Sequence, residues 1–339
     1  MQKRSLRVAV IGVGHMGRHH ARLYHDLPES DLIAVVDLDG DRAREHAKKY
    51  GAKALTDAAD LLDLNLDAAT VAVPTVAHER VAGPLIEAGV ALLVEKPLAP
   101  DTASARRLLE KATAHDAILQ VGHSERFNPV VRALDRMGLA PRFIETHRIS
   151  PFTFRSADIG VVFDMMIHDI DILLHLVRCS DYEVRAVGVN VLSQHEDVAN
   201  ARVEFANGCV ANLTASRLAL KTERKIRVFC PDAYLSLDYQ KKIGIAIKLD
   251  ANLDLLKLAR ERDLTDLSQV AGLDFGKMVN VEALQIDDVE PLRAELQAFL
   301  EAARTKTTPP VSAEEGLAAV ELAERITQAV RDHVWDRGG

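Results

Sequence analysis

The sequence predicts an α/β protein of two domains: an N-terminal domain with a parallel sheet, then an α+β domain with a large, mostly antiparallel open sheet. Up to residue 122, apolar strand-like runs alternate with helical segments, which is typical of a parallel sheet covered on both faces. After residue 123 the runs alternate apolar and polar residues, as strands with one solvated face do. A chain of 339 residues also favours two domains. We expect residues 1–123 and 124–339 to form them.

The individual elements follow from this alternation. The expected strands of the first domain are 6–12, 31–37, 68–74, 91–97 and 117–122, and its expected helices include 42–51, 78–89 and 103–116. In the second domain the expected strand runs are 182–192, 200–217 and 225–240, with turns at 206–208 and 230–233 and a helix at about 162–178. A last helix is expected at about 312–334, because Ser312 is a good N-cap and the first turn is acidic. We expect this helix to pack back on the first domain.

The composition excludes several classes of protein. A net charge of −8 leaves no basic excess to neutralise phosphates, so we expect no nucleic-acid partner. No apolar run approaches the ~20 residues that span a bilayer, and the short apolar run near the N-terminus lacks a signal-peptide cleavage site. The three cysteines, Cys179, Cys209 and Cys230, are far apart in the chain, which suits a reducing compartment. We therefore expect a cytoplasmic protein with no membrane contact.

A glycine turn follows the first expected strand. Gly12, Gly14 and Gly17 have G-x-G-x-x-G spacing between an apolar strand and a helix, which is the context that a dinucleotide-binding turn requires. The first glycine permits a tight turn, the second lets the backbone approach a pyrophosphate, and the third allows close packing of helix on sheet. The helix N-terminus adds N–H donors for phosphates, and His15 and Met16 lie within the turn. An ordinary strand–helix turn is the alternative, but the context favours a Rossmann dinucleotide-binding domain.

An acidic residue ends the second strand. Asp37 lies at about the spacing at which a carboxylate binds the adenosine ribose hydroxyls of a dinucleotide. The same carboxylate would repel a 2′-phosphate, and Leu38 and Asp39 offer no cation to bind one. Arg42 is the only cation nearby. The sequence therefore predicts NAD rather than NADP as the cofactor.

Several residues lie where later strands of this sheet are expected to end. Ligands of an open parallel sheet bind outside the carboxyl ends of its strands. Pro74, Thr75 and His78 follow one strand, and Glu95 and Lys96 end the next, so we expect them beside the nicotinamide half of the cofactor. The lysine could donate to a substrate hydroxyl and stabilise developing alkoxide charge. The alternative is a salt bridge at the strand end, although a surface pair contributes only ~0–1 kcal/mol.

One helical segment of the second half carries a polar stripe. Asp164, His168, Asp171 and His175 fall at i, i+4, i+7 and i+11, on one face of an otherwise apolar helix. Three interpretations stay open: an internal hydrogen-bond network, a metal site, or a catalytic group that faces Lys96. In the third, His168 accepts a proton from an alcohol and Asp164 orients its ring. We expect no metal, because no HExxH-type or cysteine ligand set completes a site.

Together these motifs resemble the Gfo/Idh/MocA oxidoreductases, the family of glucose–fructose oxidoreductase and inositol dehydrogenase. The resemblance rests on the glycine turn at 12–17, EKP at 95–97, GHSERFNP at 122–129, DMMIHDID at 164–171 and VSAEEGLAAVELA near the C-terminus. It implies Lys96 and His168 as the catalytic pair, with Asp164 beside them. It also implies hydride transfer between a ring carbon of a sugar or cyclitol and the nicotinamide of NAD. The open sheet of the second domain is implied to form a homodimer or homotetramer.

The lead-in to the second-domain helix departs from the family's glycine-rich form. It reads FRSADIGVVFDMMIHDID and retains only Gly160. This variant resembles the branch that acts on nucleotide sugars, which implies oxidation of the 3-hydroxyl of UDP-N-acetylglucosamine to a 3-keto sugar nucleotide. The substrate-binding residues that this resemblance implies are Arg155, Ser156, Asp158 and His168.

The roles of two residues, and alternative functions of the protein, stay open. Arg126 and Asn128 are candidates for substrate contact, although Arg126 could instead anchor the hinge between the domains. An inositol or aldose dehydrogenase of the same family, or a reductase working in the opposite direction, would share these motifs. A non-catalytic regulator that senses NAD or sugars would be expected to lack the lysine and the histidine, which are present here as Lys96 and His168. We predict an NAD-dependent sugar dehydrogenase.

Overall fold

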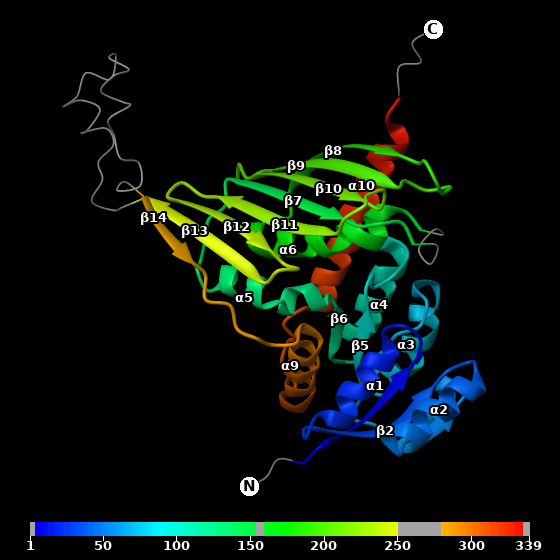
Figure 1. Cartoon of the computed structure of the whole chain (residues 1–339). Coiled ribbons are helices and arrows are strands. Elements are labelled where there is room, and N and C mark those ends of the chain that lie inside the picture. The colour runs from blue at the N-terminus through cyan, green and yellow to red at the C-terminus, as the bar shows by residue number, and fades with distance from the viewer. Residues whose placement is uncertain (1–3, 154–158, 250–278, 335–339) are drawn as a thin grey trace, which may run out of the picture.

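The computed structural model describes residues 4–153, 159–249 and 279–334. It contains two separate sheets, one of six strands and one of eight, with helices between and around them (Figure 1). Among the described residues, no helix is long and apolar enough to cross a membrane. The predicted fold class is confirmed.

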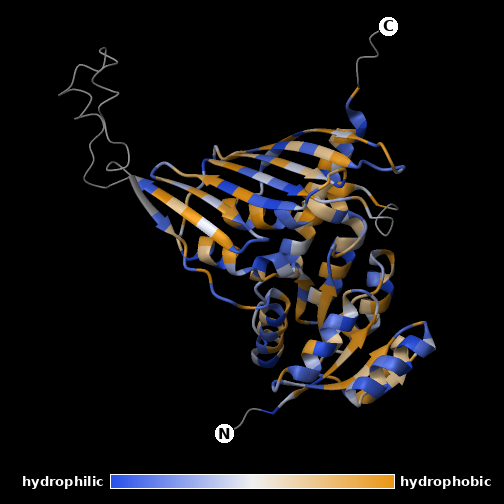
Figure 2. Ribbon diagram, viewed as in Figure 1, coloured by the Kyte–Doolittle hydropathy of each residue, from blue (hydrophilic) through white to orange (hydrophobic). Residues whose placement is uncertain are grey.

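The first sheet is parallel throughout. Its strands lie in the order β3 (Lys53–Leu55), β2 (Ser30–Val36), β1 (Leu6–Ile11), β4 (Ala68–Val71), β5 (Ala91–Glu95) and β6 (Leu119–Gly122). Its helices are α1 (Gly17–Asp26), α2 (Gly40–Tyr50), α3 (His78–Glu87), α4 (Thr102–Ala114) and, from late in the chain, α9 (Pro291–Thr305). α1 and α9 cover one face, where Leu93, Leu296 and Phe299 share a buried cluster. Because helices cover the sheet, its strands are nearly continuous apolar runs (Figure 2).

The second sheet is antiparallel except for one pair, β7 with β10. Its strands lie in the order β14 (Val279–Ala283), β13 (Ile243–Leu249), β12 (Ala233–Asp238), β11 (Glu223–Phe229), β7 (Phe143–Ile149), β10 (Val210–Ser216), β9 (Val198–Phe205) and β8 (Tyr182–Val189). Hydrophobic and hydrophilic residues alternate along these strands (Figure 2), as expected for a sheet with one covered face. The predicted turns at 206–208 and 230–233 join β9 to β10 and β11 to β12.

Two helices lie against the covered face of this sheet, α6 (Ile167–Val177) and α10 (Ala313–Asp332). The helix predicted at 162–178 is present, but its first turn, η5 (Val162–Met166), is π-helical. Ser312 caps α10 as predicted: its hydroxyl accepts from the Glu315 amide, and the Glu315 carboxylate accepts from the Ser312 amide. α10 contacts α4 beside the first sheet as well as α6 and β8 beside the second (Figure 1).

Two short helical elements connect the sheets. η3 (Ser124–Phe127) directly follows β6, and α5 (Pro129–Asp135) leads on towards β7. η3 packs against both α6 and α9, so the carboxyl end of β6 lies where the two halves of the molecule meet. This joint positions the residues of the candidate site.

Candidate active site

The glycine turn after β1 has the geometry that its spacing predicts. Gly12 has a φ of +85°, and a Cβ there would lie 2.7 Å from the Ala72 carbonyl oxygen. A Cβ on Gly17 would lie 1.7 Å from the Gly12 carbonyl oxygen, so only glycine allows α1 to start this close to the turn. Gly14 has no neighbour within 4 Å of an added Cβ, which leaves the backbone open on that side. An open backbone next to a helix N-terminus fits the pyrophosphate of NAD.

Asp37 lies beside this turn. Its Oδ2 accepts a hydrogen bond from the Val13 amide at 3.0 Å, and its Oδ1 accepts one from the Asp39 amide at 3.0 Å. The guanidinium of Arg42 is 3.4 Å from both carboxylate oxygens. The carboxylate at the end of β2 is therefore fixed against the glycine turn, as ribose binding requires. The residues present fit NAD.

Glu95 and Lys96 leave the end of β5 in different directions. The Glu95 side chain is buried, and His20 Nε2 of α1 donates to it over 2.8 Å. Burial alone would raise the pKa of Glu95, but the hydrogen bond from His20 and the Lys96 charge lower it below its ordinary value. Lys96 instead reaches the second domain, where its Nζ donates to the backbone carbonyl oxygen of Asp164 over 2.7 Å. A simple salt bridge between the two neighbours does not describe this arrangement.

The Lys96 contact brings the first turn of the η5–α6 helix to the end of β5. His168 follows Asp164 by one turn of this helix. Nδ1 of the His168 ring is buried and has no hydrogen-bond partner in the described part of the chain. Burial and the Lys96 charge lower the pKa of His168 well below its ordinary value, so the imidazole is neutral at neutral pH. A neutral imidazole beside a lysine is able to accept a proton from an alcohol.

The rest of the polar stripe forms an internal network rather than a ligand site. Arg126 donates two hydrogen bonds of 2.9 Å to Asp171 and one of 2.9 Å to Glu315. His175 lies 2.8 Å from Asp135 of α5. Arg126 is only 5% exposed, and its partners come from α6 and α10. These contacts are those of a residue that anchors the joint between the two halves, which was the alternative interpretation of Arg126.

The predicted role of Asp164 as the orienter of His168 has no support in the described geometry. The Asp164 backbone carbonyl binds Lys96, whereas His168 Nδ1 has no partner. The prediction that Asp164 orients His168 therefore has only their spacing of one helical turn to support it.

Two other predicted site residues, Asn128 and His78, hydrogen-bond to the backbone around them. Asn128 caps α5, because its Oδ1 accepts from the Val130 amide at 3.1 Å. The buried His78 ring lies 3.0 Å from the Val73 carbonyl and 3.1 Å from the Leu98 carbonyl, so it joins the loops after β4 and β5. The polar atoms of both residues are thus committed to the scaffold. Arg155, Ser156 and Asp158 lie outside the described residues.

The remaining predicted cofactor residues lie at the expected edge. Pro74 is exposed and precedes the short η2 helix (Thr75–Ala77), in which Thr75 is half-buried. His15 is exposed in the glycine turn, and Met16 is half-buried at the start of α1. In the described ranges, no group of three or more His, Cys, Asp or Glu side chains could hold a metal ion.

Three buried polar residues near Glu95 were not predicted from the sequence. They are His20, His123 and Glu295, and each is at most 1% exposed. A signal for His123 was available, because it directly follows a predicted strand at the same edge of the sheet as Lys96. His20 and Glu295 gave no comparable signal, since each lies on a helix among ordinary surface-like residues.

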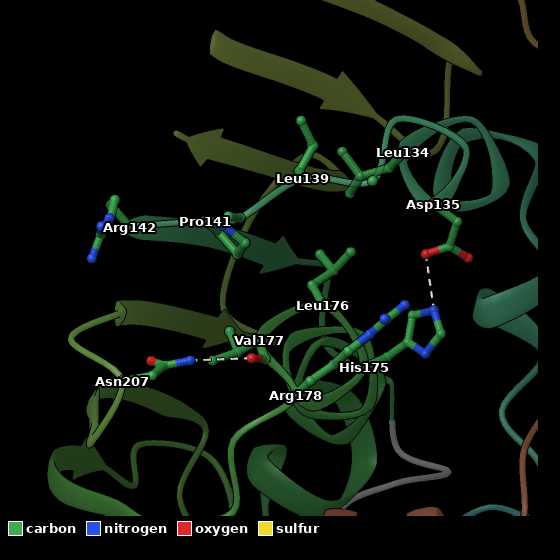
Figure 3. A pocket seen from close by; sticks show the side chains of 12 residues that line it. Leu134, Asp135, Leu139, Pro141, Arg142, His175, Leu176, Val177, Arg178 and Asn207 are labelled. Carbon is green, nitrogen blue, oxygen red and sulfur yellow. Dashed lines mark hydrogen bonds and ion pairs between the residues drawn. The ribbon is translucent and has the colours of Figure 1, made fainter. Parts of the chain in front are cut away.

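A cavity of about 400 Å³ opens at the far end of α6. Figure 3 shows that His175 and Asp135 pair at its edge and that Asn207 donates to the Val177 carbonyl. Its lining contains none of Lys96, Asp164 and His168. This cavity is therefore separate from the candidate active site.

The fold and this site define an NAD-dependent oxidoreductase with a Rossmann domain and a second domain built on a large open sheet. Residues 6–123 match the family model described as oxidoreductase family, NAD-binding Rossmann fold, and residues 141–236 match the GFO/IDH/MocA C-terminal domain. The chain belongs to the Gfo/Idh/MocA oxidoreductase family. The predicted family, enzyme class and NAD cofactor are confirmed.

Several characterised relatives act on sugars or cyclitols. The UDP-N-acetylglucosamine 3-dehydrogenase of Acidithiobacillus ferrooxidans is 40% identical over 69% of this chain and 74% of its own. Inositol 2-dehydrogenase 4 of Saccharopolyspora erythraea is 32% identical over 63% of this chain and 67% of its own. A solved structure of the Acidithiobacillus enzyme superposes with a TM-score of 0.84 at 33% identity, covering 97% of this chain and 98% of that one. Levoglucosan dehydrogenase in complex with NADH shares the fold, with a TM-score of 0.81 at 16% identity over 97% of both chains.

Proposed function

We propose that this enzyme oxidises the 3-hydroxyl of UDP-N-acetylglucosamine to a 3-keto sugar nucleotide, with NAD as the oxidant. The observation that carries the proposal is the similarity to the Acidithiobacillus 3-dehydrogenase, which extends over 97% of the chain in structure and reaches 40% identity in sequence. The similarity to inositol dehydrogenases is lower, at 28–33% identity. The stretch FRSADIGVVFDMMIHDID at 154–171, which lacks the family's glycine-rich form, supports a nucleotide-sugar substrate.

In this proposal Lys96 and His168 handle the reacting hydroxyl. Lys96 donates a hydrogen bond to its oxygen and stabilises the negative charge that develops there. His168, neutral before reaction, takes the hydroxyl proton as the C–H bond breaks. NAD, when bound, supplies the acceptor for the hydride. The Asp164 carbonyl accepts a hydrogen bond from the lysine ammonium, so this contact ties the end of β5 to the helix that carries His168 and helps to place Lys96.

The dinucleotide side of the proposed site follows the edge of the first sheet. Its proposed residues are Gly12, Gly14, His15, Met16, Gly17, Asp37, Pro74 and Thr75. The glycine turn and the N-terminus of α1 would bind the pyrophosphate, and the Asp37 carboxylate would bind the ribose hydroxyls. His78 and Glu95 would contribute indirectly, because their described hydrogen bonds are with other protein groups. His78 holds the loops after β4 and β5, and Glu95 holds the end of β5 against α1.

A direct assay of turnover tests which substrate the enzyme oxidises. Purified enzyme with NAD is offered UDP-N-acetylglucosamine, N-acetylglucosamine and myo-inositol, and NADH formation is followed by absorbance. We expect turnover only with the nucleotide sugar. In a parallel thermal-shift series, a ligand at a hundredfold excess over its dissociation constant stabilises the folded state by ~2.7 kcal/mol. Turnover of myo-inositol with no response to the nucleotide sugar would instead favour the inositol dehydrogenase alternative.

We further propose a homodimer or homotetramer in the cytoplasm. The open face of the second sheet supports the first part, because it presents alternate side chains that no described helix covers. Three unpaired cysteines support the second. Light scattering after size exclusion tests the assembly; a monomeric mass at micromolar concentration contradicts it.

A further inference from the structure

Two histidines near Lys96 have buried ring nitrogens without hydrogen-bond partners in the described structure. One is His168, through Nδ1, and the other is His123, through both Nδ1 and Nε2. His123 is only 1% exposed. Buried polar atoms of folded proteins nearly always have a partner, which is either protein or an ordered water. Neither nitrogen of the His123 ring bonds to another described residue. The ring can therefore hydrogen-bond an ordered water, which packing alone would not require.

The strand register brings His123 to the edge where Lys96 lies. Glu95 of β5 pairs with Gly122 of β6, so Lys96 and His123 are the next residues of two adjacent parallel strands. The two strand ends approach closely, because a Cβ on Gly122 would lie 3.0 Å from the Glu95 Cα. Lys96 Nζ binds the Asp164 carbonyl one turn before His168. Since η3, which begins directly after His123, also packs against α6, both rings lie at the same meeting point of the two domains.

Burial favours the neutral form of both rings, and charges from several elements act on each of them. Burial lowers the pKa of His123, and the groups that act on it are Asp171 of α6, Arg126 of η3, and Lys96 and Glu95 at the end of β5. Burial also lowers the pKa of His168, and the groups that act on it are Lys96, Arg148 of β7, His123 itself and Arg224 of β11. His123 is thus close enough to His168 to influence its protonation. A neutral imidazole has one donor and one acceptor nitrogen, which suits a chain of hydrogen bonds.

We propose that His123 is a positioning residue for His168 and hydrogen-bonds its Nδ1 through an ordered water. For His168 to take the substrate proton at Nε2, its own hydrogen must be on Nδ1, and that N–H needs an acceptor. The Asp164 side chain, which was expected to supply this acceptor, makes no hydrogen bond with His168 in the described structure. His123 and one water supply it instead. The inference rests on the proposed role of His168 as the base and on no particular sugar.

Two substitutions separate positioning from packing. His123→Phe fills similar space and removes both nitrogens, whereas His123→Gln keeps a donor and an acceptor. We expect His123→Phe to lower kcat by about tenfold or more, as the loss of an outer-shell partner does at comparable sites, with the KM for NAD unchanged. His123→Gln should recover most of kcat. Tyr24→Phe, which removes a buried hydroxyl bonded to Thr70, is the matched control and should leave kcat unchanged.

The pH profile of kcat/KM gives a readout that packing would not change. An acceptor on Nδ1–H stabilises the imidazolium of His168, so its removal should lower the pKa of the base. The low-pH limb of His123→Phe should therefore move to lower pH, and that of His123→Gln should stay near the wild-type position. If both variants lose activity equally and neither limb moves, or if His123→Phe keeps wild-type kcat, the inference is overturned.

A further variant and a crystal structure complete the test. His168→Ala should abolish turnover; if it does not, the proposed base is wrong, whereas an inactive His168→Ala with a normal His123→Phe rejects only the inference. A high-resolution crystal structure with NAD should show a water between the two rings. A direct bond from His123 to Asp171 or Glu95, with no link to His168, would overturn the inference even if the His123 variants failed to fold.

Discussion

At the scale of single residues, the end of β5 separates two charges that are adjacent in the sequence. Glu95 binds the buried His20, whereas Lys96 binds the Asp164 carbonyl of the second domain. Successive side chains of a strand leave on opposite faces, so only one of the two can face a substrate. The lysine is the one that faces the helix carrying His168.

Replacing Lys96 by methionine tests its chemistry. Lys96→Met keeps much of the apolar stem but removes the ammonium, so folding and NAD binding should persist while kcat falls by a factor of ~100 or more. Steady-state turnover and NAD titration by fluorescence measure the two effects. Lys111→Met is the control, because Lys111 lies on α4 and pairs with Glu87 at the surface. Near-normal turnover of Lys96→Met would leave the lysine with only its structural contact.

A second prediction concerns Asp37 and the choice between NAD and NADP. Its carboxylate lies 3.4 Å from the Arg42 guanidinium. Asp37→Ala removes the group that repels a 2′-phosphate and leaves Arg42 with Asp39 as its remaining partner, 3.3 Å away, so that Arg42 can also bind a phosphate. We therefore expect the preference for NAD over NADP to fall. The ratio of kcat/KM for the two cofactors measures this. Asp37→Ala combined with Arg42→Ala should lose the gained use of NADP; an unchanged ratio in the single variant would mean that Asp37 does not select the cofactor.

At the scale of elements, α6 is joined to the second sheet by a buried ion pair. Arg148 of β7 donates two hydrogen bonds, of 2.8 and 2.9 Å, to Asp169. Both side chains are at most 4% exposed. Asp169→Ala leaves the buried arginine charge with only the longer contact of 3.5 Å to Glu125, so we expect the free energy of unfolding to fall by about 3–5 kcal/mol. Urea denaturation measures the loss.

An exposed pair is the control for this prediction. Glu204 and Arg202 form an equally short arginine–carboxylate contact on β9, but both side chains are more than 40% exposed. Glu204→Ala should change the urea midpoint little, because solvent screens such a pair. Similar losses for Asp169→Ala and Glu204→Ala would show that burial does not govern the contribution of the Arg148 pair.

At the scale of the whole molecule, α9 returns from the second domain to cover the first sheet and brings a carboxyl group into the core. Glu295 is fully buried, and neither of its oxygens has a hydrogen-bond partner in the described structure. Burial, and after it the Glu95 charge, raises the pKa of Glu295 well above its ordinary value. The folded state therefore retains a proton that the unfolded chain releases above about pH 4.3. Stability from this group is present at lower pH and is lost as pH rises.

Glu295→Gln removes this dependence. We expect the variant to gain stability relative to the wild type as pH rises from 5 to 8, because glutamine has no proton to lose. Urea unfolding of both proteins at several pH values in this range measures the difference. Glu110→Gln, at an exposed position of α4, should show a difference that does not vary with pH. A constant difference for Glu295→Gln would mean that Glu295 is ionised in the folded protein.

Local patterns account for what could be predicted. The continuous apolar runs predicted the parallel sheet, the G-x-G-x-x-G spacing predicted the turn at Gly12 and Gly17, and Ser312 predicted the start of α10. The strands β3 and β7 were not predicted: β3 has three residues, too few for a period, and β7 (FIETHRI) mixes charged residues into a central strand. The place of β7 depends on neighbours that come much later in the chain, β10 and β11.

The sequence by itself determined the fold class and the cofactor and predicted Lys96 and His168 as candidate catalytic residues, because each of these depends on local patterns of residues. The tertiary structure alone decided which groups meet. His20 and Glu95 are 75 positions apart, Lys96 and Asp164 are 68 apart, and Arg126 and Asp171 are 45 apart. Periodicity shows which face a residue occupies but not what lies opposite it. The partners of a buried polar group are set by packing between distant elements, and only the folded chain brings those elements together.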